Sequence, residues 1–396
     1  MGFRSGRQSE KWIVSLQYFV YFGIMGIYLP YFNLYCFHLG FSGFQIGILS
    51  AARSLVLIVL PLVWSWLADR FQVRKSLYIA CNMLSTAIWA FFLFTVDFGF
   101  MLVITIAYGI FYAPIISFLE AFSMDVLGRH KKSYGRIRVW GSVSFILVVM
   151  LAGKMIDLFS IKIIVAGILA GSFLLAVMSV KLPESQTVSK RPLIAGAKSL
   201  LNRQVLVFLA SAFLMLVSHG TYYGFFSIHL ESLGYGNTFI GVSWALAVVA
   251  EILVMLASRR VLKRYALERV LAFSFAAAVL RWLALFWFKS PAVIILSQGL
   301  HAFSYGTFHI ASILYIDRAS PEAAKTIGQA INNAVSYGLG LMVGFFISGL
   351  LYERLGSFAL FGLSSLIALS GGILLTGSQW FGRWEKPASE PNVIPR

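Results

Sequence analysis

Apolar stretches of about 20 residues recur along almost the whole chain, from Trp12 to Ser378, with only short polar connections between them. A helix of that length crosses the ~30 Å hydrocarbon core of a bilayer. The chain is 59% hydrophobic and only 12% charged, whereas soluble domains carry roughly one-quarter charged residues. The sequence therefore predicts an all-α integral membrane protein without a large extramembrane domain.

We expect about 12 transmembrane helices in two six-helix bundles. The first span has no small-residue cleavage site after it and is too long and aromatic for a signal-peptide core, so we expect it to be retained. The predicted spans are residues 12–37, 44–68, 76–95, 98–121, 135–154, 161–180, 204–230, 238–258, 269–288, 291–316, 327–352 and 357–379.

The basic residues are distributed over alternate loops. A net charge of +17 could suggest a nucleic-acid partner, but charges spread over separate loops form no single basic face, so none is predicted. The positive-inside rule places both termini in the cytoplasm, because one set of loops holds few basic residues beyond Lys154, Lys162, Lys289 and Arg354. The other set holds Arg70, Arg74, Lys75, Arg129, Lys131, Lys132, Arg136, Lys190, Arg191, Lys198, Arg203, Arg259, Arg260, Lys263, Arg264 and Arg269.

The chain contains an internal repeat. LGFSGFQIGILSA, from Leu39 to Ala51, matches LGYGNTFIGVSWA, from Leu233 to Ala245, and the same offset carries Asp69-Arg70-Phe71 onto Lys263-Arg264-Tyr265. We therefore predict two homologous bundles in the same orientation, which can rock about a site at the membrane midplane. The predicted units are an N-terminal bundle (1–181), a cytoplasmic linker (182–203), a C-terminal bundle (204–380) and a cytoplasmic tail (381–396).

Ionisable side chains inside the predicted spans are the candidate functional residues. Each costs several kcal/mol in a bilayer unless it faces protein or water. For the histidines taken singly, a hydrogen-bonded position in the helix interface is an equally good explanation. His301 and His309 are two helical turns apart with no carboxylate between them, so no metal site is predicted. The candidates are Arg53, Glu120, Arg138, His219, Glu251, Arg281, His301 and His309.

WSWLADRFQVRK, from Trp64 to Lys75, resembles the loop signature of the major facilitator superfamily, Gly-x-Leu-Ala-Asp-Arg-x-Gly-Arg-Arg-Lys. The resemblance implies a transporter fold and gives Asp69, Arg70 and Arg74 the role of a conformational latch between the cytoplasmic ends of neighbouring helices. Both signature glycines are replaced in this chain, at Trp64 or a neighbour and at Gln72 or Val73.

The segment EAFSMDVLGRHKKSYGRIRVWG, from Glu120 to Gly141, resembles the segment between the fourth and fifth helices of the lactose permease family. This resemblance implies that Glu120 and Arg138 bind substrate, since a carboxylate facing a guanidinium forms a polar pair in a low-dielectric cavity. A purely structural salt bridge is the alternative.

Three residues of the second half also resemble the proton-coupling network of the lactose permease family. Arg281 and His301 have the same spacing of twenty residues, and Glu251 lies in a similar Ala-Glu-Ile run. Ser304 replaces that family's next glutamate, so Glu251 is expected to carry the proton, with His301 or His219 assisting. The predicted proton-coupling residues are Glu251, Arg281, His301 and His309.

Four further segments, SHGTYYGFFSIHL, WALAVVAEIL, LRW and LHAFSYGTFHIAS, resemble the 3-phenylpropionate permease family, which also often has an arginine like Arg53 in its second helix. The resemblance covers almost the whole chain. The predicted substrate-binding residues are Glu120, Arg138, Arg53, His219, Tyr222, Trp140 and Phe145.

These observations lead to the hypothesis of a secondary active transporter, a proton-coupled symporter of a small organic substrate. The resemblance to the phenylpropionate group favours an aromatic or other monocarboxylate, and three intramembrane arginines against two glutamates leave one arginine for a substrate carboxylate. The alternative is a proton-coupled sugar or nucleoside permease; an exporter or a non-transporting membrane protein is a further possibility. We expect a monomer in the lipid bilayer of the inner (cytoplasmic) membrane that uses the proton gradient, has no cofactor and is not an enzyme.

Overall fold

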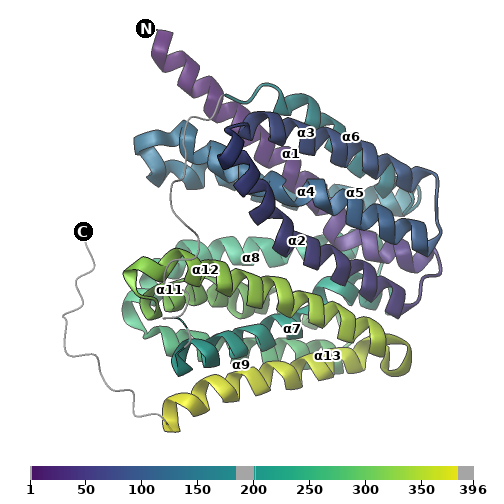
Figure 1. Cartoon of the computed structure of the whole chain (residues 1–396). Coiled ribbons are helices and arrows are strands. Elements are labelled where there is room, and N and C mark those ends of the chain that lie inside the picture. Colours follow the sequence, from purple (N-terminus) through teal and green to yellow (C-terminus); the bar gives the residue numbers. More distant parts are fainter. Residues whose placement is uncertain (1, 184–199, 201, 382–396) are drawn as a thin grey trace.

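The computed structural model describes residues 2–183, 200 and 202–381, and its regular structure is helical throughout this part (Figure 1). The first half contains six long helices, two of which are followed by short 3₁₀ turns. They are α1 (Gly2–His38), α2 (Gly43–Phe71), α3 (Arg74–Trp89) with η1 (Ala90–Leu93), α4 (Phe98–Leu127) with η2 (Gly128–Ser133), α5 (Tyr134–Leu158) and α6 (Ile163–Ser179).

The second half contains more elements because two of its membrane crossings are interrupted by π-helical segments, η4 and η6. Its elements are α7 (Arg203–Ser232), α8 (Asn237–Arg264), α9 (Leu267–Trp287), α10 (Pro291–His301), η4 (Ala302–Thr307), α11 (Phe308–Ala319), η5 (Glu322–Ala324), α12 (Lys325–Asn332), η6 (Asn333–Gly340) and α13 (Leu341–Phe381).

The described helices form twelve membrane crossings. Nine helical segments are long and apolar enough to span a bilayer, and one of these, Lys325–Gly377, turns back at Gly356 and therefore counts twice. Gly356 has φ 71° and ψ 168°, a conformation that side chains other than glycine rarely adopt. The shorter α6 and the interrupted α10–α11 add the last two crossings. The predicted all-α fold is confirmed.

Three helices extend well beyond their predicted spans: α1 begins at Gly2, α4 continues to Leu127 and α8 continues to Arg264. Lys263 and Arg264 lie in the last turn of α8, where cations interact favourably with the helix dipole, so the helix continues after its hydrophobic stretch ends. Most of the predicted linker and nearly all of the predicted tail lie outside the described residues, and the proposed domain division remains a prediction.

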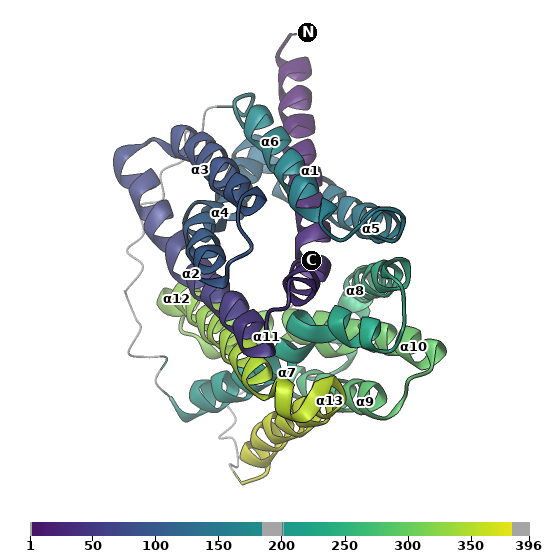
Figure 2. The ribbon, with the colours of Figure 1, turned by 90° about the vertical axis from the view of Figure 1, so that its right-hand side faces the viewer.

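The two halves pack as separate bundles, with the first half above the second in Figure 1, and helices of the two halves contact each other. α2 packs along α13, α5 packs along α8, and α1 contacts α7. Figure 2, which looks along the molecule from one end, shows the same division into two groups of helices. The start of α1 and the end of α13 lie at the same end of the molecule.

Glycines let the bundles approach closely at the opposite end, where α1, α5 and α7 end and α2 and α8 begin. A Cβ atom at Gly153 on α5 would lie 2.3 Å from the backbone oxygen of Asn237, and one at Gly47 on α2 would lie 2.8 Å from the Cα of Gly349. The hydroxyl of Tyr31 lies 3.1 Å from this same Asn237 oxygen. We call this region the closed end.

Two carboxylates at the closed end accept hydrogen bonds from the first backbone amides of helices in the opposite bundle. Asp157, at the end of α5, lies 2.8 Å from the amide nitrogens of both Asn237 and Thr238 at the start of α8. Glu353 lies 2.8 Å from the amide nitrogen of Gly43 at the start of α2. Leu39 and Leu233 set the repeat offset at 194 residues, which makes Gly43 and Asn237 equivalent. The two contacts are therefore near-symmetric helix caps between bundles.

Removing both caps, in the double variant Asp157→Ala and Glu353→Ala, should shift the protein away from this conformation. A capping interaction contributes about 1 kcal/mol, so two of them change the equilibrium roughly 30-fold. Spin labels at the exposed Ser160 and Lys289 should show a larger population of long distances than in the parent protein. An unchanged distance distribution would show that the glycine contacts alone hold this end closed.

Candidate functional site

Arg281, His301 and Glu251 form a continuous chain of polar contacts between α9, α10 and α8. The Arg281 Nη1 lies 2.6 Å from Nδ1 of His301, and Nε2 of His301 lies 2.7 Å from Oε1 of Glu251. A guanidinium can only donate, so Nδ1 is the acceptor and the His301 proton is on Nε2, where it donates to the Glu251 carboxylate. His301 is thus neutral and connects a positive group to a negative one.

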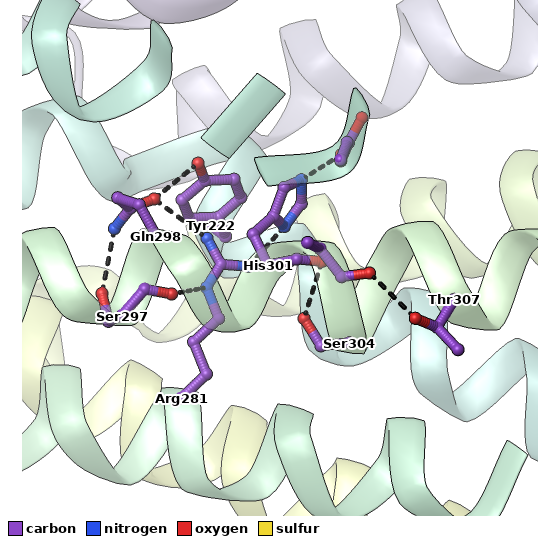
Figure 3. Close-up of polar contacts among 9 residues, drawn as sticks. Tyr222, Arg281, Ser297, Gln298, His301, Ser304 and Thr307 are labelled. Carbon is purple, nitrogen blue, oxygen red and sulfur yellow. Dashed lines mark hydrogen bonds and ion pairs between the residues drawn. The ribbon is translucent and has the colours of Figure 1, made fainter. Parts of the chain in front are cut away.

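Arg281 is completely buried and is held by groups on three sides (Figure 3). Its Nε donates to the Ser297 backbone oxygen at 3.1 Å and its Nη2 donates to Oε1 of Gln298 at 3.2 Å. The Tyr222 hydroxyl donates to that same Gln298 oxygen at 3.0 Å, and the Arg281 Cζ lies 4.0 Å from the Tyr222 ring centre. A buried charge requires such partners. The structure therefore places Tyr222, a predicted substrate contact, as a support for Arg281.

Glu251 is the most accessible member of the chain of contacts, since 17% of its side chain is exposed and only 4% of the His301 side chain is. The π-helical segment η4 follows directly after His301 and brings Gly306 against Glu251. A Cβ atom at Gly306 would be 3.6 Å from Cγ of Glu251. Single π-helical turns are frequent at functional sites, and this one positions the histidine and the backbone beside the carboxylate.

Aromatic rings continue the group along η4 and α11. The Tyr305 ring is stacked at 5.2 Å on His301 and at 6.3 Å on His309, with interplanar angles of 12° and 6°. His309 Nδ1 lies 2.7 Å from the Tyr337 hydroxyl. Tyr305 thus lies between His309 and His301, two of the predicted proton-coupling residues. The hydrogen-bond partner of His309, Tyr337, is on η6.

His219 on α7 faces the same group. Its Nδ1 lies 2.8 Å from the Met215 backbone oxygen, which places the proton on Nδ1 and leaves Nε2 as a hydrogen-bond acceptor. Nε2 is buried and has no partner among the described residues. The ring lies 6.2 Å from His301 and 5.7 Å from Tyr305. Buried polar atoms are rarely unpaired, so this acceptor is available to a substrate donor or a proton.

In the first half, Arg53 on α2 lies among tyrosines. Its Cζ is 4.2 Å from the ring centre of Tyr28, and it is within electrostatic range of Tyr21, Tyr108 and Tyr112. The rings of Tyr21 and Tyr112 are stacked 5.3 Å apart, and those of Tyr108 and Tyr112 are 4.8 Å apart. The buried Tyr112 hydroxyl has no partner among the described residues. A guanidinium beside aromatic faces suits an aromatic anion.

Arg138 on α5 stacks on an aromatic ring. Its Cζ lies 3.8 Å from the ring centre of Phe22. It is also the charge that acts on the Glu120 carboxyl, although the two form no ion pair among the described residues. Glu120 is exposed at its position on α4 and lies in the field of Tyr18 and Tyr134. Because Glu120 and Arg138 do not form an ion pair with each other, both remain available to a ligand.

Two predicted cavity walls lie elsewhere on α5. Trp140 packs on Trp12 near the start of α1, with ring centres 5.9 Å apart. Phe145 is buried where α5 crosses α1: a Cβ atom at Gly26 would be 3.0 Å from the Phe145 backbone oxygen. The structure therefore does not show these residues in contact with Arg138.

The predicted latch residues lie at the end of α2 and the start of α3. Arg74 Nη2 lies 3.0 Å from Oδ1 of Asp69, and its Nη1 lies 3.2 Å from Oδ2 of Asp125 at the end of α4. Arg70 is not part of this ion pair and lies 5.5 Å from the Trp66 ring centre. Asp125, which was not among the predicted latch residues, connects this loop to α4.

The second half contains a charge-reversed version of this contact. The 194-residue repeat offset places Glu268 at the position equivalent to Arg74, and Glu268 pairs with Arg318 at the end of α11. Asp125 is equivalent to Ala319, the residue next to Arg318. The repeat therefore keeps an ion pair at this place in both halves while exchanging its signs.

Comparisons with known proteins agree with this architecture. The chain is 28% identical to the "Probable 3-phenylpropionic acid transporter" of Escherichia coli (strain K12), which aligns over 91% of this chain and 96% of the relative. The maltose permease of Geobacillus stearothermophilus is 23% identical over 94% of this chain and 95% of that protein. The crystal structure of the nucleoside transporter NupG superposes with a TM-score of 0.84 at 17% identity, over 93% of this chain and 98% of that one.

Fold and relatives together define a transporter of the major facilitator superfamily, a class distinct from enzymes. The sequence model of the MFS_1 like family matches residues 11–363, and the chain belongs to this family. The predicted family and fold are thereby confirmed, whereas the roles predicted for individual residues remain to be tested.

Proposed function

We propose that this protein is a proton-coupled symporter that takes up a small organic anion. The observation that carries the proposal is the buried chain of contacts from Arg281 through neutral His301 to the partly accessible Glu251. Glu251 lies in a membrane-spanning helix beside other polar groups, and its side chain is partly exposed. This is the arrangement expected for a residue that binds and releases a proton.

The same contacts suggest how proton and anion binding are coupled. While Glu251 is ionised, its charge compensates Arg281 through His301. Protonation of Glu251 removes that compensation and leaves a net positive charge in a low-dielectric region. An organic anion then restores neutrality, so each ligand increases the affinity for the other. This reciprocity favours joint transport of a proton and an anion.

An aromatic monocarboxylate is the substrate class that the first half supports best. Arg53 and Arg138 both lie over aromatic rings and have no acidic ion-pair partner among the described residues. Such a group offers a guanidinium for the carboxylate and ring faces for the aromatic part. The relative whose name refers to 3-phenylpropionic acid supports the same class.

A neutral sugar or nucleoside is the second candidate. The unpaired Glu120 carboxyl, within range of Arg138, could accept hydrogen bonds from substrate hydroxyls. The maltose permease and NupG are relatives whose names refer to such substrates. Glu120→Gln separates the two: sugar or nucleoside transport would be lost, whereas transport of an acid would be little changed.

The orientation of the chain follows from its basic loops. We place both termini in the cytoplasm of a cell with an inner membrane, because the described arginine- and lysine-rich connections lie at the same end as the start of α1 and the end of α13. In this orientation the closed end faces away from the cytoplasm and the structure represents an inward-facing state of alternating access. The protein would act there as a monomer, driven by the proton gradient alone.

Uptake into proteoliposomes tests the function. Labelled 3-phenylpropionate, benzoate, maltose and uridine would each be presented with and without an inward proton gradient. We expect gradient-driven uptake of an aromatic acid above the level in protein-free liposomes, which corrects for passive diffusion of the neutral acid. Uptake of uridine or maltose and of no acid would replace the proposed substrate class with the second candidate.

A further inference from the structure

A groove of about 410 Å³ lies on the second bundle, and its lining does not include Glu251, His301 or Arg281. Its walls are the last turns of α8 and the first turns of α9, and its floor is formed by η4 and the start of α11. The lining is mostly apolar, and its charged member, Arg269, lies where α8 connects to α9. The lining includes Ala257, Tyr265, Arg269, Phe273, Phe303 and Thr307.

The apolar part of the groove is open to its surroundings. Phe273 is 53% exposed and Phe303 is 39% exposed, and their rings meet edge to face with centres 5.7 Å apart. Exposed aromatic side chains on a membrane-spanning bundle face lipid. A cleft of this volume is in the range that holds a small ligand, and its walls match the hydrocarbon of an acyl chain.

The polar end of the groove carries unbalanced positive charge. Arg269 lines the groove, is exposed and has no ion-pair partner among the described residues. Arg264 lies beside Tyr265, with its Cζ 5.8 Å from that ring centre. The nearest acid in sequence, Glu268, is already paired with Arg318. Cations are therefore gathered where the α8–α9 connection meets the membrane surface.

The α2–α3 connection of the first half is equivalent to the α8–α9 connection, but its arginine is paired with acids. There Arg74 is neutralised by Asp69 and Asp125. The repeat replaces Asp69 with Lys263, so the second half keeps the basic loop but loses that acid. The groove therefore combines an apolar cleft with cations that have no ion-pair partner in the part of the chain that the structure describes.

We propose that this groove binds an anionic phospholipid, with its phosphate at Arg269 and one acyl chain along Phe273 and Phe303. Basic clefts between transmembrane helices, at the depth of the headgroups, are suited to such lipids. The floor residues Phe303 and Thr307 belong to η4, the segment that also presses Gly306 against Glu251. A bound lipid thus supports the segment that positions the polar group, whichever substrate the protein carries.

Native mass spectrometry of the detergent-solubilised full chain tests this site with phosphatidylglycerol as the probe. Arg269→Gln removes the phosphate contact, and Ala257→Trp fills the groove while leaving the cations in place. We expect each to reduce the bound fraction at least fivefold. Arg354→Gln is the matched control, since it removes an exposed arginine from the opposite end and should bind as the parent does.

Two competitors complete the test. Phosphatidylcholine should bind much less than phosphatidylglycerol, and inorganic phosphate should not displace the lipid. The proposal is overturned if Arg269→Gln and Ala257→Trp bind the lipid like the parent, or if inorganic phosphate displaces the lipid fully. It is also overturned if the parent protein is a dimer that the groove variants convert to a monomer, because a second copy of the chain would then cover the groove. None of these outcomes depends on transport, so the lipid site and the proposed function can fail separately.

Discussion

Replacing Glu251 by glutamine is expected to abolish gradient-driven accumulation of substrate while exchange of substrate across the membrane continues. Glutamine keeps the size of the side chain and can accept the hydrogen bond from His301, but it cannot bind and release a proton. The net charge around Arg281 is then the same as in the parent protein with Glu251 protonated, so the substrate can still enter the site. Uptake into proteoliposomes, with and without an imposed pH gradient, and counterflow against preloaded substrate measure the two properties.

The control for this experiment is Glu322→Gln, because that glutamate is 88% exposed and lies in the short η5 turn. It should accumulate substrate as the parent protein does. If Glu251→Gln still accumulates substrate against its gradient, Glu251 is not the coupling residue and the proton must be carried by another group, with the unpaired acceptor of His219 as the next to test.

Replacing Arg53 by alanine is expected to weaken binding of an aromatic monocarboxylate roughly 10- to 150-fold. This range corresponds to the loss of one hydrogen bond to a charged group, about 1.5–3 kcal/mol. The aromatic rings of Tyr28 and Tyr21 would remain, so the variant should retain weak affinity for the ring of the substrate. Isothermal titration calorimetry in detergent, with 3-phenylpropionate as the ligand, measures the change directly.

Two further variants show whether the effect is due to the guanidinium. Arg53→Lys keeps a positive charge but cannot hold a carboxylate in a bidentate contact, so its affinity should fall between those of the parent and the alanine variant. Arg354→Ala, at an exposed position far along the chain, should bind normally. Equal affinities for the parent and Arg53→Ala would place the substrate carboxylate at Arg138 or Arg281 instead.

The fold was predictable because the membrane imposes a length on each apolar stretch. Every predicted span corresponds to a described crossing, and the repeat at Leu39 and Leu233 marked equivalent helix starts. The extents of α1, α4 and α8 were underestimated, since hydropathy locates the hydrocarbon core and not the end of a helix. The π-helical turn η4 carries no composition signal, because its residues would also suit an uninterrupted helix.

The polar group around Arg281 was also predictable in its membership. Charged residues in apolar spans are few, and the resemblance to the lactose permease family grouped Glu251, Arg281 and His301, whose role in proton coupling stays a prediction. The sequence could not order them: only the geometry shows that His301 lies between the two charges and is neutral. Tyr222 was identified as well, but its place beneath Arg281 depends on packing.

The residues that were not predicted are mostly those whose partners lie far away in the sequence and close only in the folded structure. The tyrosines around Arg53 are hidden among 17 tyrosines in the chain, although Tyr108 and Tyr112, one helical turn apart, could have indicated a common face. Asp125 and Asp157 lie at helix ends, where a carboxylate is an ordinary solvated residue until a partner is known. Applying the repeat offset to Arg74 would have identified Glu268.

Proton movement during transport is the most direct test of the central claim, that Glu251 couples a proton to an organic anion. The measurement is the internal pH of lightly buffered proteoliposomes containing a trapped pH-sensitive dye, after 3-phenylpropionate is added outside. Protein-free liposomes again give the passive contribution. We predict faster internal acidification with the parent protein, and only the passive rate with Glu251→Gln. Transport of the labelled acid without extra acidification, or equal acidification by both proteins, would contradict the claim.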